Sequence, residues 1–125
     1  MTPRQLLAPL LDRCAAAAQQ VYDQWEQDAE GNDVEYGSGG ICDGIAEAMV
    51  DVLSTAGLEA GTVHYEQDNH TVAVAEIHGR FYEVDIPLGL YERGGWYNYQ
   101  KISGVHFTAR DVEVVELPES PFDSQ

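Results

Sequence analysis

Three side chains of this sequence could together carry out acyl-transfer chemistry: Cys42, His70 and Asp85. A thiolate attacks an acyl carbon, an imidazole moves the proton, and a carboxylate holds the imidazole in the required orientation. Cys42 follows Gly39-Gly40-Ile41 and stands where we expect a helix to begin. The unpaired N–H groups and the positive end of a helix favour a thiolate there. Cys42 is therefore the candidate nucleophile, the alternative being a small buried hydrophobe.

The relation between His70 and Asp85 follows from a predicted β-hairpin. Two strand-like runs are separated only by His78-Gly79, which predicts a two-residue turn. With that turn Asp85 faces Val72, so that His70 and Asp85 become diagonal neighbours on one face of the hairpin. A turn one residue longer would move Asp85 to the opposite face. The predicted pairing of imidazole and carboxylate therefore depends on this turn.

A zinc site is the alternative use of the same three side chains, with His64 or Asp68 as a further ligand. No closely spaced pair of cysteines or histidines anchors such a site, so we expect no metal and no cofactor. Cys14 belongs to an apolar helical stripe, and we expect it in the core.

The elements around these residues predict an α+β fold. A capping-box pattern at Thr2 and an apolar stripe that reaches Trp25 predict an N-terminal helix, which Pro9 should kink. A second helix is expected from Ile41 or Cys42 to Ala56. The runs expected to form strands, mostly antiparallel, are 62–65, 71–77, 80–86, 105–107 and 112–117.

Two segments between these elements are expected to be loops. Residues 26–40 show no hydrophobic period and end in a glycine-rich stretch. Residues 87–104 are rich in aromatic side chains, and this segment either walls the cleft beside the cysteine or caps the core. We expect a single catalytic-type domain over residues 1–117 and a frayed tail over 118–125.

The order of these motifs resembles the transglutaminase-like branch of the papain-like cysteine enzymes. The matching features are Gly40-Ile41-Cys42 at a helix start, His70 leading one strand, and Asp85-Ile86-Pro87 at the end of the next. The resemblance covers residues 39–88, under half of the chain. It implies a nucleophile-bearing helix packed on an antiparallel sheet. It also implies hydrolysis of a peptide or amide, deamidation, or acyl transfer to an amine, with a protein or peptide as substrate.

Carried over by position, the resemblance makes Cys42 the nucleophile, His70 the general base and acid, and Asp85 the orienting group. The backbone N–H of Cys42 would hold part of the oxyanion. This chain departs from the pattern at Asp43, where many relatives have an aromatic residue. A carboxylate beside the sulfur disfavours the thiolate unless it points away.

Three further residues are candidates for holding the oxyanion or the substrate. Tyr36 stands six residues before the cysteine, where papain-like enzymes have a glutamine, and its hydroxyl could take that role. Gly40 precedes the nucleophile, and Trp96 lies in the aromatic segment. The resemblance thus assigns a minimal substrate site to this short chain.

The charge of the chain bears on its partners. The 125 residues include 22 acidic against 6 basic residues, for a formal net charge of −16. Six scattered basic residues cannot neutralise a run of phosphates, so direct nucleic-acid binding is excluded. A basic protein partner or a cationic substrate stays open.

A second hypothesis follows from this acidity. The chain could be a non-enzymatic inhibitor on a papain-like scaffold, a decoy that imitates the phosphate array of nucleic acid, as some phage-encoded anti-defence proteins do. A third is an enzyme from a salt-rich environment. With no secretory signal or membrane-spanning run visible, we expect a cytoplasmic protein without a membrane partner and with reduced thiols.

Overall fold

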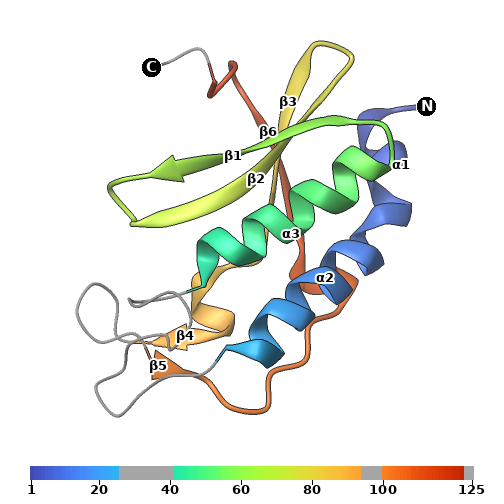
Figure 1. The fold of residues 1–125 in the computed structure, drawn as a ribbon. Helices are drawn as coiled ribbons and strands as arrows, with labels where there is room; N and C mark the ends of the chain where they lie inside the picture. Colours follow the sequence, from blue (N-terminus) through green and yellow to red (C-terminus); the bar gives the residue numbers. More distant parts are fainter. Residues whose placement is uncertain (26–40, 94–99, 123–125) are drawn as a thin grey trace.

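The fold is α+β in a computed structural model that describes residues 1–25, 41–93 and 100–122 (Figure 1). A four-stranded antiparallel sheet has the strand order β1-β2-β3-β6. Helix α3 packs against β1 and β2 and also against α2, so it lies between the sheet and the N-terminal helices. The helices are α1 (Pro3–Leu7), α2 (Leu11–Gln24) and α3 (Cys42–Thr55), and the sheet consists of β1 (Glu59–Tyr65), β2 (His70–Ile77), β3 (Arg80–Asp85) and β6 (Glu113–Leu117).

The N-terminal helical segment begins and bends as its sequence predicts. The hydroxyl of Thr2 accepts a hydrogen bond from the N–H of Gln5 at 3.1 Å, and the Gln5 side chain accepts one from the N–H of Thr2 at 2.8 Å. Pro9 lies in a single 3-10 turn, Ala8–Leu10, that separates α1 from α2. Since proline lacks an N–H, it interrupts the helical hydrogen bonds and produces this break. No helix in the described part of the chain is long and apolar enough to cross a bilayer.

The core lies between the helices and one face of the sheet. Alternate residues of β2 and β3 face it, because successive side chains of a strand point to opposite faces. Both helices contribute one apolar stripe. The buried residues of this core include Cys14, Ala18 and Tyr22 of α2, Ile45, Met49 and Leu53 of α3, and Ala73, Ala75, Ile77, Tyr82 and Val84 of the sheet.

The hairpin of β2 and β3 has the predicted register. Ile77 pairs with Arg80, so the turn between them consists of His78 and Gly79 alone. Both turn residues have positive φ, 54° for His78 and 77° for Gly79. This is the backbone of a type I′ turn, whose twist matches that of the flanking strands. The prediction of a two-residue turn is confirmed.

The predicted strand over 105–107 is wrong. The N–H of Phe107 donates to the side-chain oxygen of Gln19 at 2.7 Å, and the carbonyl of Val105 accepts from the Gln19 amide at 3.1 Å. A side chain of α2 therefore satisfies the backbone groups that a neighbouring strand would otherwise pair. The Phe107 ring is buried edge-to-face against Tyr22 and Tyr91.

Two further expectations are corrected in their extent. β1 begins at Glu59, three residues before the predicted start. The segment expected to be a loop over 87–104 contains a short 3-10 helix, Leu88–Leu90, and an antiparallel ribbon. Its strands are β4 (Glu92–Arg93) and β5 (Gln100–Lys101).

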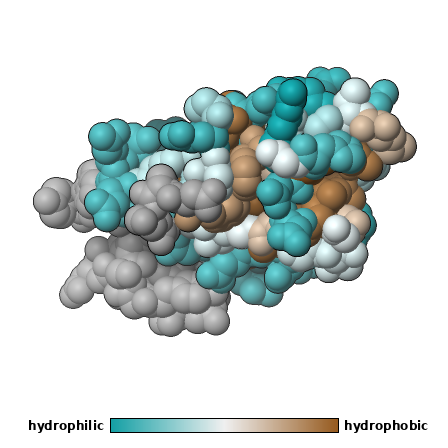
Figure 2. Space-filling model, turned by 90° about the horizontal axis from the view of Figure 1, so that it is seen from above, coloured by the Kyte–Doolittle hydropathy of each residue, from teal (hydrophilic) through white to brown (hydrophobic). Residues whose placement is uncertain are grey.

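Part of the segment expected to be a frayed tail packs on the sheet. The ring of Phe122 meets the ring of Phe81 edge-to-face, with centroids 6.0 Å apart, and lies beside Gly61. Figure 2, which views the molecule from above Figure 1, shows an apolar area bordered by hydrophilic side chains. The sheet therefore also carries apolar packing on the face that lies away from the helices.

Replacing Gly79 with alanine should lower the free energy of unfolding by about 1–2 kcal/mol, because a β-carbon is unfavourable in the left-handed conformation. A β-carbon at Gly79 meets no atom within 4 Å, so the change would report backbone conformation alone. Gly89→Ala is the matched control, since it also adds a methyl group to open space but without a positive φ. Urea unfolding of both variants measures the difference, and equal stabilities would contradict the turn assignment.

Candidate active site

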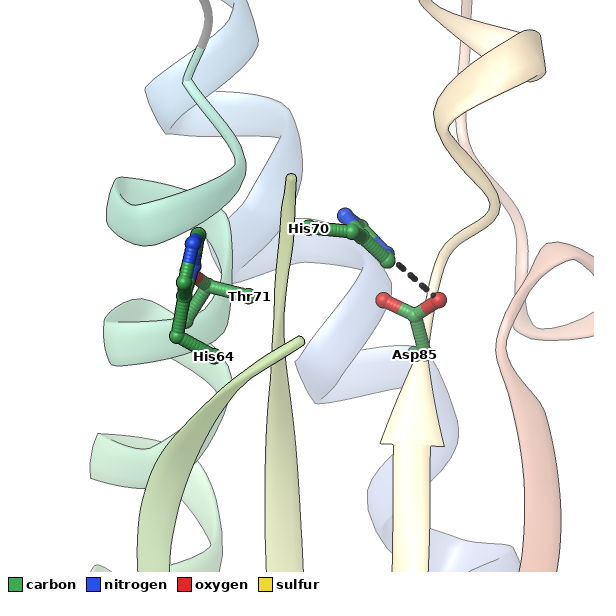
Figure 3. Close-up of polar contacts among 4 residues, drawn as sticks. All are labelled: His64, His70, Thr71 and Asp85. Atoms are coloured by element: carbon green, nitrogen blue, oxygen red, sulfur yellow. Dashed lines mark hydrogen bonds and ion pairs between the residues drawn. The ribbon is translucent and has the colours of Figure 1, made fainter. Parts of the chain in front are cut away.

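The imidazole of His70 and the carboxylate of Asp85 form a direct hydrogen bond across the end of the hairpin. His70 Nε2 lies 2.9 Å from Asp85 Oδ2, and both side chains are 12% exposed (Figure 3). His70 is the first residue of β2 and follows Asn69, whose φ of 48° ends the preceding turn. Asp85 is the last residue of β3. The observed register therefore brings the two side chains together as the sequence predicts.

The thiol of Cys42 interacts with the same imidazole from the start of α3. Cys42 is the first residue of the helix, is partly exposed, and lies close enough to His70 for a side-chain hydrogen bond. Nε2 is hydrogen-bonded to Asp85, so Nδ1 is the ring nitrogen that remains available to the sulfur. Nδ1 makes no hydrogen bond of full geometry within the described residues. The Cys42–His70 contact is thus looser than the His70–Asp85 bond, as is common for cysteine–histidine pairs without a substrate.

The surroundings of His70 favour its charged form. Burial by itself lowers the pKa of the imidazole, but the hydrogen bonds with Asp85 and Cys42, and the negative charge of both groups, outweigh that effect. The net result raises the pKa of His70 from 6.5 to about 10. At neutral pH the ring is therefore an imidazolium, which places a positive charge and an available proton beside the sulfur.

Asp43 is held by a second polar chain that sequence reasoning missed. Its carboxylate accepts a short hydrogen bond from the Thr71 hydroxyl, which in turn bonds His64 Nδ1 at 2.8 Å. Figure 3 shows Thr71 and His64 on the opposite side of β2 from His70. The carboxylate next to Cys42 is therefore directed toward this chain. The sequence indicated these hydrogen bonds only in that Thr71 follows His70 on a strand, so that its side chain points to the opposite face.

Tyr91 and Glu92 place two further buried polar groups at the site, and neither was singled out as a site residue from the sequence. Tyr91 is fully buried and Glu92 is 8% exposed. The Tyr91 hydroxyl and Glu92 Oε1 have no hydrogen-bond partner within the described residues. Burial raises the pKa of Glu92 to about 7, although nearby His70 acts in the opposite direction. Burial also raises the pKa of Tyr91, and the negative charge of Cys42 adds to that effect.

A third acidic group lies on the sheet beside this site. Burial raises the pKa of Glu83, a hydrogen bond with Tyr65 lowers it, and the negative charge of Asp85 raises it again. For Tyr65, burial and the neighbouring Glu83 raise the pKa to about 12. His70 is thus the positive charge that interacts with Asp85, Glu83 and Glu92.

The remaining candidates from the sequence are placed as follows. Tyr36, Gly40 and Trp96 lie outside the described residues. Cys14 is fully buried in the core, as expected, and burial raises the pKa of its thiol to about 11. Within the described part of the chain, no group of three or more histidine, cysteine, aspartate or glutamate residues is arranged to hold a metal ion.

No protein family, no curated protein and no solved structure matches the chain.

Replacing Asp85 with asparagine should lower the pKa of His70 by about 1–3 pH units, because the imidazolium loses the charge that faces it. Glu83→Gln is the control for charge alone: it removes a carboxylate on the same strand that interacts electrostatically with His70 but does not hydrogen-bond the ring, so it should lower the pKa of His70 by less. An NMR titration of the His70 ring measures both variants. An equal pKa of His70 in the two variants would contradict the role assigned to Asp85.

The stability of the protein should fall as pH rises from 6.5 to about 10. The folded pKa of His70 is above the unfolded value, so this stabilisation is complete below pH 6.5 and is lost as pH rises through 10. Urea unfolding between pH 6.5 and 9 measures the slope in the wild type and in His70→Gln. The slope should be shallower in the variant, and identical slopes would show that His70 is not the group responsible.

Proposed function

We propose that this chain is a cysteine-dependent acyl-transfer enzyme in which Cys42, His70 and Asp85 act together. The observation that carries the proposal is one imidazole, bonded to Asp85 at 2.9 Å and within reach of a cysteine at the start of a helix. A nucleophile, a base and an orienting group in this order are what acyl transfer through a thioester requires.

The first half of the proposed reaction forms a thioester. The thiolate of Cys42 attacks the carbonyl carbon of an amide, and the carbonyl oxygen becomes an oxyanion. The N–H of Cys42 is in the first turn of α3, where backbone donors lack partners within the helix, and it can donate to this oxyanion. His70 gives its Nδ1 proton to the leaving nitrogen, the C–N bond breaks, and an amine departs.

The second half releases the acyl group. His70, now neutral, takes a proton from a water molecule or from an amine as that molecule attacks the thioester. The C–S bond breaks, the sulfur leaves as a thiolate, and His70 is again an imidazolium. Asp85 stabilises the charged ring in both halves and fixes Nδ1 toward the sulfur. Water gives hydrolysis or deamidation, whereas an amine gives transfer.

The transglutaminase-like branch of the papain-like enzymes is the family that we propose for this chain. The proposal is supported by the order of Cys42, His70 and Asp85 along the chain and by an antiparallel sheet packed on the cysteine-bearing helix. A peptide or protein amide is the substrate class that goes with it.

Iodoacetamide should alkylate Cys42 faster than Cys14 in the native protein at pH 7. Cys14 is fully buried, and a thiol with a pKa of about 11 leaves only about one thiolate in ten thousand at that pH. Cys42 is partly exposed beside an imidazolium. Peptide mass spectrometry at timed intervals measures both rates. Equal rates, or a faster Cys14, would argue against an activated nucleophile.

Turnover should depend on the three residues to different degrees. A mixture of unstructured peptides, incubated with and without a primary amine, reveals hydrolysis, deamidation or transfer through the mass of the products. Cys42→Ala should abolish the reaction, and His70→Gln should slow it by about 10²–10⁴-fold. Asp85→Asn should also slow it, and by more than Glu83→Gln, which removes a nearby charge but not the hydrogen bond to the ring.

The same variants separate this proposal from an acidic decoy. A decoy binds a basic partner through many surface carboxylates, so Cys42→Ala would leave its function intact. Neutralising the exposed groups Glu113 and Glu116 would then weaken binding, mainly in the association rate and most at low salt. Function that survives Cys42→Ala and is lost in the charge variant would overturn the enzyme proposal.

A further inference from the structure

Glu92 is a buried carboxyl group to which the proposed mechanism gives no task. It is the first residue of the short strand β4, and Figure 1 shows β4 near the end of α3 at which Cys42 lies. Only 8% of the residue is exposed, yet Oε1 has no hydrogen-bond partner within the described residues. Leaving a buried polar atom unpaired costs about 1–3 kcal/mol. A buried group that costs stability and interacts electrostatically with His70 is a candidate for binding a ligand.

Tyr91 supplies a second unpaired polar atom next to it. Its ring is fully buried and packs edge-to-face on Phe107, with ring centroids 5.9 Å apart, so the phenol is fixed in place. Its hydroxyl has no hydrogen-bond partner within the described residues. The hydroxyl is close enough to Cys42, Glu92 and Asp85 to feel the charge of each. Tyr91 thus interacts electrostatically with both Glu92 and Cys42.

The chemistry of the missing partner follows from these groups. A carboxylate oxygen can only accept hydrogen bonds, and a phenol can accept one on its oxygen. The charges that act on Tyr91 are negative, those of Cys42, Glu92, Asp85 and Asp43, and the positive charge of His70 acts on Glu92. Lys101 is the cross-strand partner of Glu92, but its ammonium donates to the Trp25 carbonyl and lies over the Tyr22 ring. A cationic N–H donor satisfies Oε1 and is attracted by the surrounding field, whereas an anion is repelled.

We propose that Glu92, with the Tyr91 hydroxyl beside it, binds a cationic group of the substrate, an ammonium or a guanidinium, next to the acyl carbon that Cys42 attacks. This inference rests on the proposed function and adds a specificity to it. Amides that carry a lysine- or arginine-like group beside the scissile bond, or amines that accept the acyl group, are then preferred to acidic substrates.

The charge preference of Cys42 can be measured without knowing the substrate. Two methanethiosulfonates of similar size, the cationic aminoethyl and the anionic sulfonatoethyl reagent, each form a disulfide with a thiolate and release methanesulfinate. The rate of the cationic reagent at Cys42 is divided by the rate of the anionic reagent, and this ratio is normalised by the same ratio for mercaptoethanol. The normalised ratio reports the electrostatic potential at the sulfur. Cys14→Ala removes the competing thiol, and pH 8 keeps Glu92 mostly ionised, since its pKa is about 7.

We expect the normalised ratio to favour the cation in the parent protein and to fall by about tenfold in Glu92→Gln, as removal of one nearby charge requires. Asp51→Asn is the matched control. It removes one exposed carboxylate from α3, nine residues and about 13 Å along the helix from Cys42. An equal change in both variants would mean that a general acidic field sets the ratio, and would overturn the subsite.

A second measurement needs no variant at Glu92 and so survives a folding defect in Glu92→Gln. In the wild type, butylammonium should slow the alkylation of Cys42 by neutral iodoacetamide, whereas butanol, its uncharged counterpart, should not. Absence of protection by butylammonium overturns the subsite. If Cys42 is no more reactive than Cys14, the proposed function fails and this inference fails with it. A reactive Cys42 without protection contradicts the subsite alone.

Discussion

The hydrogen bond between His70 and Asp85 is the interaction on which the candidate site depends, and the register of one hairpin determines whether it can form. The two residues lie at the open end of the β2–β3 hairpin, while His78 and Gly79 close the other end. Because side chains alternate between faces, a slip of one residue would move Asp85 to the other side of the sheet. The left-handed conformation of the turn therefore controls the geometry of an imidazole at the far end of the hairpin.

Electrostatics give the site its second property. Two acidic residues near the site differ in their surroundings: the Asp43 carboxylate is hydrogen-bonded by Thr71, whereas the buried Glu92 has an oxygen with no hydrogen-bond partner among the described residues. The imidazolium of His70 balances part of the charge of Asp85 and Glu92. This arrangement agrees in sign with the net charge of −16 for the whole chain. In the subsite that we propose, part of this acidity selects a cationic substrate.

Local sequence signals predicted the parts of the fold that local interactions determine. The capping box at Thr2, the break at Pro9 and the two-residue turn are each set by neighbouring residues, and all three are confirmed. The pairing of His70 with Asp85 could be predicted because it follows from that turn by counting residues along two strands.

Long-range interactions account for what the sequence did not reveal. Residues 105–107 looked like a strand, but their backbone groups bond Gln19, which is 88 residues from Phe107. The Asp43–Thr71–His64 chain joins a helix to two strands, and no local pattern indicates such a contact. The burial of Glu92 could not be predicted for a similar reason. Whether a charged residue in a loop-like segment is buried depends on the residues that pack around it.

Acylation of Cys42 is the most direct test of the central claim. The protein is mixed with 4-nitrophenyl acetate, the release of nitrophenol is followed in the first turnover, and the acylated residue is identified by mass spectrometry. The account predicts a burst with one acetyl group on Cys42, no burst in Cys42→Ala, and slow release of the acetyl group in His70→Gln. The account would be contradicted if no acetyl group appeared on Cys42. It would also be contradicted if the acetyl group formed and left at the same rates in His70→Gln as in the wild type.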